Sequence, residues 1–192
     1  MINFIITFLL TLRETLLESQ ISTHFPHFFL NCLQKFLGSG LLDLKHSNIM
    51  WLAEEILFVL ARNENENIQK LLNLCLIRIL SFGDIRIITI GFWNLLVKYC
   101  RLPCYSLIFS LVNLSILKIL KRIEEKDFPF NEMLIKINEF FKKTKKISSG
   151  EDASMKIIKY LLNKMVQYRG LEIIEYCKKI PDISETLIRF ST

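Results

Sequence analysis

The sequence predicts an all-α fold, a helical repeat array of the HEAT or armadillo kind with about eight to ten helices. Three observations support this prediction. Apolar residues make up 51% of the 192 positions, against only six glycines and four prolines. The apolar side chains recur at spacings of three and four, which is the period of an amphipathic helix and not of a strand. Helix pairs follow one another every ~40 residues, the period of HEAT and armadillo arrays.

The first third of the chain predicts three helices. The helix over 2–18 places five apolar residues on one face: Phe4, Phe8, Leu9, Leu12 and Leu16. Thr23 can cap a second helix over 24–37, which Gly38-Ser39-Gly40 ends. A third helix is predicted over 47–62, with Ser47 or Asn48 as its N-cap.

Three further helices are predicted in the middle of the chain. A polar link at 63–67 precedes a helix over 66–80, and Asp84 can cap the next one, over 85–99. The run 85–90 alone would also suit a buried strand, but its continuation to Tyr99 is too long for one strand. A helix over 104–124 follows Pro103 and becomes basic towards its end, where cations suit the helix dipole.

The last part of the chain predicts two long helices and two short ones. Asn131 can cap a helix over 131–143, and a basic loop over 142–151 separates it from a helix over 152–168. Gly170 ends that helix. Shorter helices are expected over 171–179 and after Pro181.

We expect residues 1–192 to form a single α-helical domain. A core-type helix that begins at residue 1 would also suit a piece cut from a longer parent chain. The apolar run over 1–12 is too short to cross a bilayer and lacks the basic start and small-residue cleavage site of a signal peptide. A compact helical bundle, without repeats, is an alternative that the pattern leaves open.

No catalytic, cofactor-binding or metal-binding residue is predicted. The three histidines, His24, His27 and His46, stand in no metal or catalytic motif, and no glycine-rich loop could cradle a phosphate. The cysteines are odd in number and lie mostly in apolar helical patterns, which favours reduced thiols in a cytosolic protein. They are Cys32, Cys75, Cys100, Cys104 and Cys177. We therefore expect a protein that is not an enzyme.

The formal net charge of +6 suits an acidic partner of some kind, whether nucleic acid, an anionic membrane or an acidic protein surface. Much of the excess lies late in the chain, at Lys142, Lys143, Lys145, Lys146, Lys156 and Lys159. A solvated helix end and loop is the simplest interpretation of this run. Nucleic acid is disfavoured, because Phe140 and Phe141 end a periodic helix and suit a core better than a stacking platform.

Four stretches in order resemble the C-terminal helical domain of the ch-TOG and Mini spindles family of TOG-domain microtubule polymerases. They span about residues 50–180 and match that family in spacing as much as in identity. The stretches are ILFVLAR at 56–62 followed by IQKLL at 68–72, GFWNLLVKY at 91–99 followed by Leu-Pro, MLIKINEFF at 133–141, and MKIIKYLL at 155–162 followed by Gly170.

The resemblance implies an adaptor that docks coiled-coil proteins of the TACC class and supports microtubule organisation at spindle poles and centrosomes, in the cytoplasm. Such docking suits a helix laid into an apolar groove with a basic rim. We therefore predict eight partner-binding residues: Phe140, Phe141, Lys142, Lys143, Lys145, Lys146, Lys156 and Lys159. The alternative is another armadillo-like or HEAT-like adaptor that is unrelated to microtubules.

Overall fold

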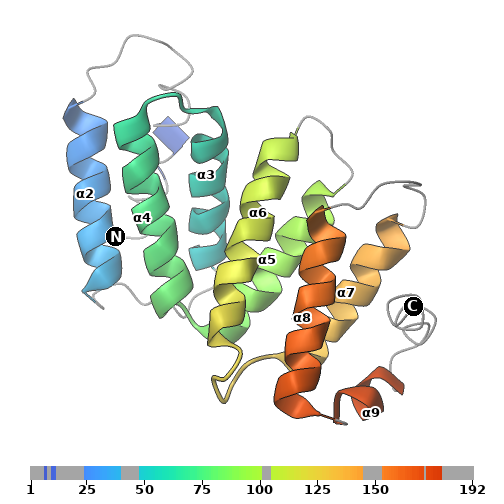
Figure 1. Cartoon of the computed structure of the whole chain (residues 1–192). Helices are drawn as coiled ribbons and strands as arrows, with labels where there is room; N and C mark the ends of the chain where they lie inside the picture. The colour runs from blue at the N-terminus through green and yellow to red at the C-terminus, as the bar shows by residue number, and fades with distance from the viewer. Residues whose placement is uncertain are drawn as a thin grey trace. The chain divides into compact units, whose positions relative to one another are not determined.

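The computed structural model describes residues 7, 10–11, 24–39, 48–100, 105–144, 153–170 and 172–178. These residues form helices and turns, with no strand among them, which confirms the predicted all-α fold (Figure 1). Of the predicted helix over 2–18 only residues 7, 10 and 11 are described, and the helix predicted after Pro181 lies outside the described residues. The elements are α2 (His24–Gly38), α3 (Asn48–Arg62), α4 (Glu66–Phe82), α5 (Ile85–Tyr99), α6 (Ser106–Ile119), the 3-10 turn η2 (Leu120–Arg122), α7 (Phe130–Thr144), α8 (Ala153–Arg169) and α9 (Glu172–Lys178).

The chain forms two compact units, residues 1–88 and residues 89–192, which divide within α5. In each unit, two helices that are next-but-one in sequence are neighbours. They are α2 and α4 in the first unit, and α6 and α8 in the second. Stacked helix pairs produce this pattern, so it is consistent with the predicted helical repeat. That all 192 residues form a single domain stays a prediction.

In the first unit, α2 and α4 pack side by side and α3 packs against α4. The buried face of α4 includes Ile68, Leu72, Cys75 and Ile79, at spacings of three and four, as the sequence predicts. The thiol of Cys75 donates a weak hydrogen bond to the carbonyl oxygen of Leu30 at 3.7 Å. This contact joins the middle of α4 to the middle of α2.

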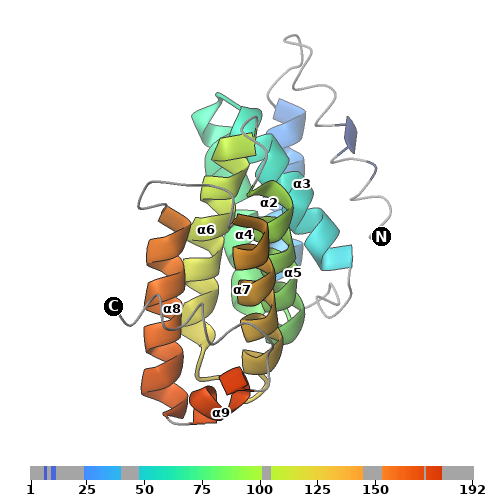
Figure 2. The same ribbon diagram turned by 90° about the vertical axis from the view of Figure 1, so that its right-hand side faces the viewer.

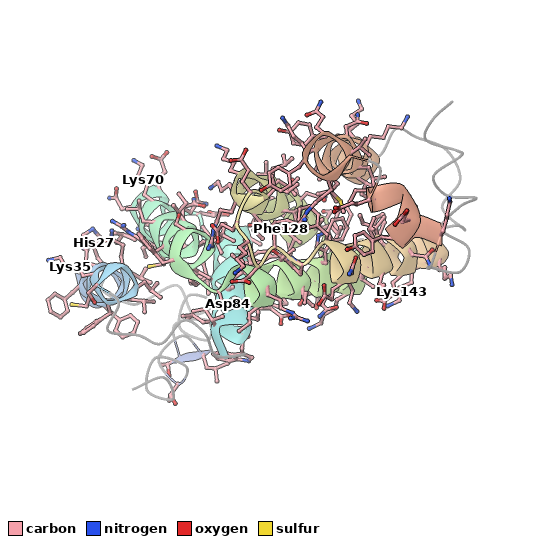
Figure 3. All side chains as sticks on the ribbon, turned by 90° about the horizontal axis from the view of Figure 1, so that it is seen from below. His27, Lys35, Lys70, Asp84, Phe128 and Lys143 are labelled. Atoms are coloured by element: carbon pink, nitrogen blue, oxygen red, sulfur yellow. The ribbon has the colours of Figure 1, made fainter. Side chains whose placement is uncertain are left out.

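Two helices of the first unit begin at side-chain caps. The side-chain oxygen of Asn65 accepts hydrogen bonds from the backbone N–H groups of the second and third residues after it, at 3.0 and 3.3 Å. Asp84, labelled in Figure 3 at the start of α5, accepts two such bonds at 3.0 Å each. Since the first N–H groups of a helix have no partner within the helix, these bonds stabilise both starts. The predicted cap at Asp84 is confirmed.

In the second unit, α6 and α8 lie side by side in one layer, with α7 and the adjoining part of α5 in the layer behind (Figures 1 and 2). The core of this unit contains buried residues from all four helices, α5 to α8. Its fully buried residues on α7 and α8 include Met133, Leu134, Ile137, Phe140, Ile158, Leu161 and Met165. Gly170 ends α8 with φ of +58°, a left-handed conformation that favours glycine, as the sequence predicts.

Two predicted helix boundaries in the second unit are wrong, the start of α7 and the end of α6. Asn131 does not cap α7, because the carbonyl of Pro129 already accepts the N–H of Met133 at 3.0 Å, so helical hydrogen bonding starts two residues earlier. The helix predicted over 104–124 is α-helical only to Ile119 and closes in the tighter turn η2. Such 3-10 turns are common at the ends of α-helices.

Candidate partner-docking surface

The structure places Phe140 and Phe141 in the core of the second unit. Their side chains are 1% and 7% exposed, and the two rings pack edge to face with centroids 6.0 Å apart. Both belong to the buried stripe of α7, which is wide enough to include adjacent positions. Their burial confirms that these residues suit a core, and it does not fit their predicted role as partner-binding residues.

The four described lysines of the predicted surface are exposed. Lys142 and Lys143, where the predicted helix over 131–143 and the predicted loop over 142–151 overlap, lie in the last turn of α7. Lys156 and Lys159 lie in the first half of α8. Figure 3 labels Lys143 on the outside of α7. Lys145 and Lys146 lie outside the described residues.

The packing of α7 against α8 brings these lysines to one end of the helix pair. At the opposite end, the ring of Phe130, the first residue of α7, stacks on the ring of Tyr168, near the end of α8, with centroids 6.0 Å apart. The two helices are therefore antiparallel, so the end of α7 and the start of α8 lie at the same end of the second unit, where the two ribbons diverge (Figure 1). Both short basic segments of the sequence therefore lie at one end of the second unit, which we call the basic end of α7 and α8.

Positive charge continues along the whole of α8. This helix contains four cationic residues, Lys156, Lys159, Lys164 and Arg169, and no aspartate or glutamate. The ammonium of Lys164 lies 5.9 Å from the centre of the Tyr160 ring, and that ring is 48% exposed. By contrast, α7 also carries Glu132 and Glu139. The basic field of this unit is therefore concentrated on α8.

The neighbouring helix α6 exposes two large apolar side chains that the sequence analysis did not single out. Leu107 and Leu114 are each 54% exposed, and apolar residues extend around most of the circumference of α6. Because apolar residues lie on every side of α6, periodicity alone does not identify its exposed face.

A weaker signal in the sequence does mark the exposed face of α6. Ser110 and Lys118 are eight residues apart, and Leu114 lies midway between them at a spacing of four from each. Positions at this spacing share one face of a helix, so the two polar residues indicate that Leu114 faces the same way. Both polar residues are exposed in the structure.

The two thiols with shifted pKa values are core groups. Burial raises the pKa of Cys75 to about 12, and burial also raises the pKa of Cys177. A reactive cysteine needs a lowered pKa, because the thiolate is the nucleophile. In the part of the chain that the structure describes, no three histidine, cysteine, aspartate or glutamate side chains gather as metal ligands would.

No protein-family model, curated protein or solved structure matches this chain. The resemblance to the microtubule polymerases therefore rests on the sequence stretches alone. Within the described ranges, no helix has both the length and the apolar character that crossing a bilayer requires.

Proposed function

We propose that the protein is a non-catalytic scaffold that docks an acidic coiled-coil partner through the basic end of α7 and α8. The observation that carries this proposal is the charge of α8, which has four cations and no acidic residue along its length. Lys142 and Lys143 extend the positive surface onto α7. A surface of one sign attracts a partner of the opposite sign and suppresses wrong partners.

The sequence resemblance supports a specific form of this proposal, an adaptor of the microtubule-polymerase type. Its partner would be a coiled coil of the TACC class, and its location the spindle poles and other microtubule-organising centres. Coiled coils carry charged residues, often glutamate and lysine, at the e and g positions beside their apolar seam, so a partner rich in glutamate there would match the basic end. An adaptor of the HEAT kind outside the cytoskeleton would use the same surface with another acidic partner.

Exposed lysines act mainly on the rate of association, because each surface ion pair contributes only about 0–1 kcal/mol. The proposal therefore expects binding that weakens steeply as salt rises, since charges further apart than about 8 Å are screened at physiological ionic strength. Apolar contacts must supply the rest of the binding free energy.

The test compares charge-reversed proteins for binding to a purified TACC-class coiled coil, by isothermal titration calorimetry. The test variant is Lys156→Glu with Lys159→Glu. The matched control is Lys35→Glu with Lys70→Glu, which reverses two exposed lysines of the first unit, on α2 and α4 (Figure 3). We expect the α8 variant to bind at least about tenfold more weakly and the control to bind like the native protein. Equal binding by all three proteins would refute the basic end as the docking site.

The same variants can be tested in cells, by locating the tagged proteins in dividing cells by fluorescence microscopy. Native protein and control variant should gather at spindle poles, and the α8 variant should be diffuse. Binding to an acidic partner without any spindle-pole signal would favour the adaptor unrelated to microtubules.

A further inference from the structure

Two neighbouring helices of the second unit contain no acidic residue. They are α6, with 14 residues, and α8, with 17. α6 carries Lys118 in its last turn, and Lys121 follows in η2. α8 adds four cations, of which Arg169 pairs with Glu172 of α9 at 3.6 Å, so α6, η2 and α8 together carry an excess of positive charge.

The two exposed leucines of α6 point the same way. Leu107 and Leu114 are seven residues apart, which is almost two full turns, so their side chains differ in direction by only about 20°. Along the helix axis they are separated by about 10 Å. A second helix that carries apolar residues at i and i+7 has the same spacing, so it can match both leucines at once.

The exposed sides of α6 and α8 open in the same direction. The layer that contains α7 and part of α5 covers the other side of both helices, as Figure 2 shows. The exposed residues of α6, Leu107 and Leu114, and those of α8, Tyr160 and Lys164, therefore lie on the outer face of one layer. We call the face formed by these four residues with Lys118 the outer α6–α8 face.

We propose that the outer α6–α8 face is the docking site for an amphipathic helix whose apolar residues recur at i and i+7 and whose flanks are acidic. Leu107 and Leu114 are the apolar anchors, and Lys118 and Lys164 meet the acidic flanks. This inference rests on the proposed function, because it assumes that the protein docks a helical partner. It adds the apolar contacts that the basic end of α7 and α8 does not provide.

The residues favour a helix over a nucleic acid as the occupant. Two aliphatic side chains in line give a nucleic acid little to bind, since single strands bind by stacking on aromatic rings. The outer α6–α8 face has one aromatic ring, that of Tyr160. An acidic amphipathic helix, by contrast, matches both the apolar line and the cations beside it.

The probe is a fluorescein-labelled, hydrocarbon-stapled peptide about three heptads long, with leucine at its a and d positions and glutamate on its flanks. A matched peptide has lysine in place of each glutamate, and an oligouridine of similar length serves as the nucleic-acid probe. Binding to the full chain is measured by fluorescence anisotropy. We expect the acidic peptide to bind, and the basic peptide and the oligouridine to bind at least about tenfold more weakly.

Two double variants and their matched controls locate the site. Leu107→Ser with Leu114→Ser should weaken binding of the acidic peptide at least about tenfold, and Lys118→Glu with Lys164→Glu should do the same. The control for the leucines is Leu74→Ser with Ile77→Ser, which changes two aliphatic residues of α4 that are 43% and 37% exposed. Lys35→Glu with Lys70→Glu is the control for the lysines. Both controls should bind within about twofold of the native protein, because truncation away from an anchor is nearly neutral.

The outcomes separate this inference from the proposed function. Loss of coiled-coil binding in the Lys156 and Lys159 variant, with no effect of the leucine changes on coiled coil or peptide, would overturn the inference and leave the function standing. Peptide binding that depends on the leucines, without binding of the TACC-class coiled coil, would support the inference and reject the microtubule-type function. Stronger binding of the oligouridine than of the peptide would overturn the inference. All variants are exposed substitutions, and circular dichroism checks that each protein remains folded.

Discussion

At the scale of single residues, close backbone approaches and caps set the geometry between helices. Gly83 follows α4 with ordinary extended backbone, φ of −64° and ψ of 155°. A Cβ atom added there would lie 2.6 Å from the carbonyl oxygen of Ile79 and 2.8 Å from the side chain of Ile88. Glycine is required here by space. At Gly170 it is required by conformation, since φ is +58° and nothing lies within 4 Å of an added Cβ.

Replacement of these two glycines should therefore have different effects. Gly83→Ala should lower the free energy of unfolding by about 1–3 kcal/mol, because a buried backbone contact must shift. Gly170→Ala should cost about 1 kcal/mol through backbone strain, and Gly170→Asn less, because asparagine tolerates the left-handed region. Urea denaturation measures all three. An asparagine at 170 that is no better than alanine would contradict the conformational explanation.

The thiol of Cys75 makes stability depend on pH in the alkaline range. Its pKa is raised by burial from 9.0 to about 12, so the folded state disfavours the thiolate that the unfolded chain readily forms. The stability that this group contributes is complete below pH 9 and is lost as the pH rises towards 12. Between pH 9 and pH 10.5 the loss should be about 2 kcal/mol.

The measurement is urea denaturation at these two pH values for the native protein and for Cys75→Ala. The variant should be less stable at both values because it leaves a cavity, but its stability should fall less between them. Equal slopes in the two proteins would show that Cys75 is not the titrating group.

At the scale of elements, aromatic contacts join the start of α7 to the end of α8. The ring of Phe130 stacks on Tyr168 with an angle of 10° between the planes, and the Arg169 guanidinium lies 4.8 Å from the centre of the Phe130 ring. The hydroxyl of Tyr168 donates a hydrogen bond to the carbonyl of Glu124 at 3.1 Å. These contacts fix the antiparallel pairing that places the exposed lysines of α7 and α8 at the same end of the second unit.

The contribution of Tyr168 can be compared with that of Tyr160 on the same helix. Their exposures are similar, 45% and 48%, but Tyr160 contacts the flexible side chain of Lys164. Tyr168→Ala should lower stability by about 1–2 kcal/mol, from lost ring packing and one hydrogen bond. It should also speed amide hydrogen exchange in the last turn of α8. Tyr160→Ala should change either quantity little. Equal effects of the two substitutions would contradict a specific role for the contacts of Tyr168 with Phe130 and Glu124.

Elements with a clear amphipathic period were predictable from the sequence. The α4 pattern of Ile68, Leu72, Cys75 and Ile79 predicts the buried face correctly, and Asp84 is recognisable as a cap from its place before an apolar run. The true start of α7 was not predictable in the same way. The chain after Pro129 is already helical, so Asn131 lies in the first turn, where an asparagine looks like a cap in the sequence.

The candidate site was less predictable, because burial depends on neighbouring elements. Phe140 and Phe141 are adjacent to lysines in sequence, but the wide apolar stripe of α7 takes both into the core. The exposed leucines of α6 were missed for the opposite reason, since apolar residues lie on every side of this helix and only Ser110 and Lys118 mark the side that meets solvent. The lysine pairs of α7 and α8 could be grouped into one partner-binding set from the sequence, and the structure places them at the same end of the second unit.

At the scale of the whole molecule, the two units carry different surface chemistry. The exposed aliphatic residues Leu74 and Ile77 of the first unit lie on a helix that carries acidic Glu66 paired with Lys70 at 3.9 Å. In the second unit, α6 and α8 combine exposed leucines with cations and contain no acidic residue. Charge complementarity therefore directs an acidic partner to the second unit.

The salt dependence of partner binding should show whether the positive charge of the second unit directs the partner. The affinity for an acidic helical partner should fall at least about tenfold between 50 mM and 500 mM sodium chloride, because the Debye length shortens to a few ångströms. In the Lys118→Glu and Lys164→Glu variant the residual binding should depend on salt much less. Salt-independent binding of the native protein would mean that the cations of α6 and α8 do not contact the partner.

The central claim is that the protein is an interaction scaffold for an acidic coiled coil. The most direct measurement is affinity purification of the tagged native protein from its own cells, beside the Lys156→Glu and Lys159→Glu variant and the Lys35→Glu and Lys70→Glu control, with quantitative mass spectrometry of the bound proteins. We predict that an acidic coiled-coil protein is recovered with the native protein and the control and is lost from the α8 variant. Recovery of the same proteins with all three, or of no coiled-coil protein with any, would contradict the claim.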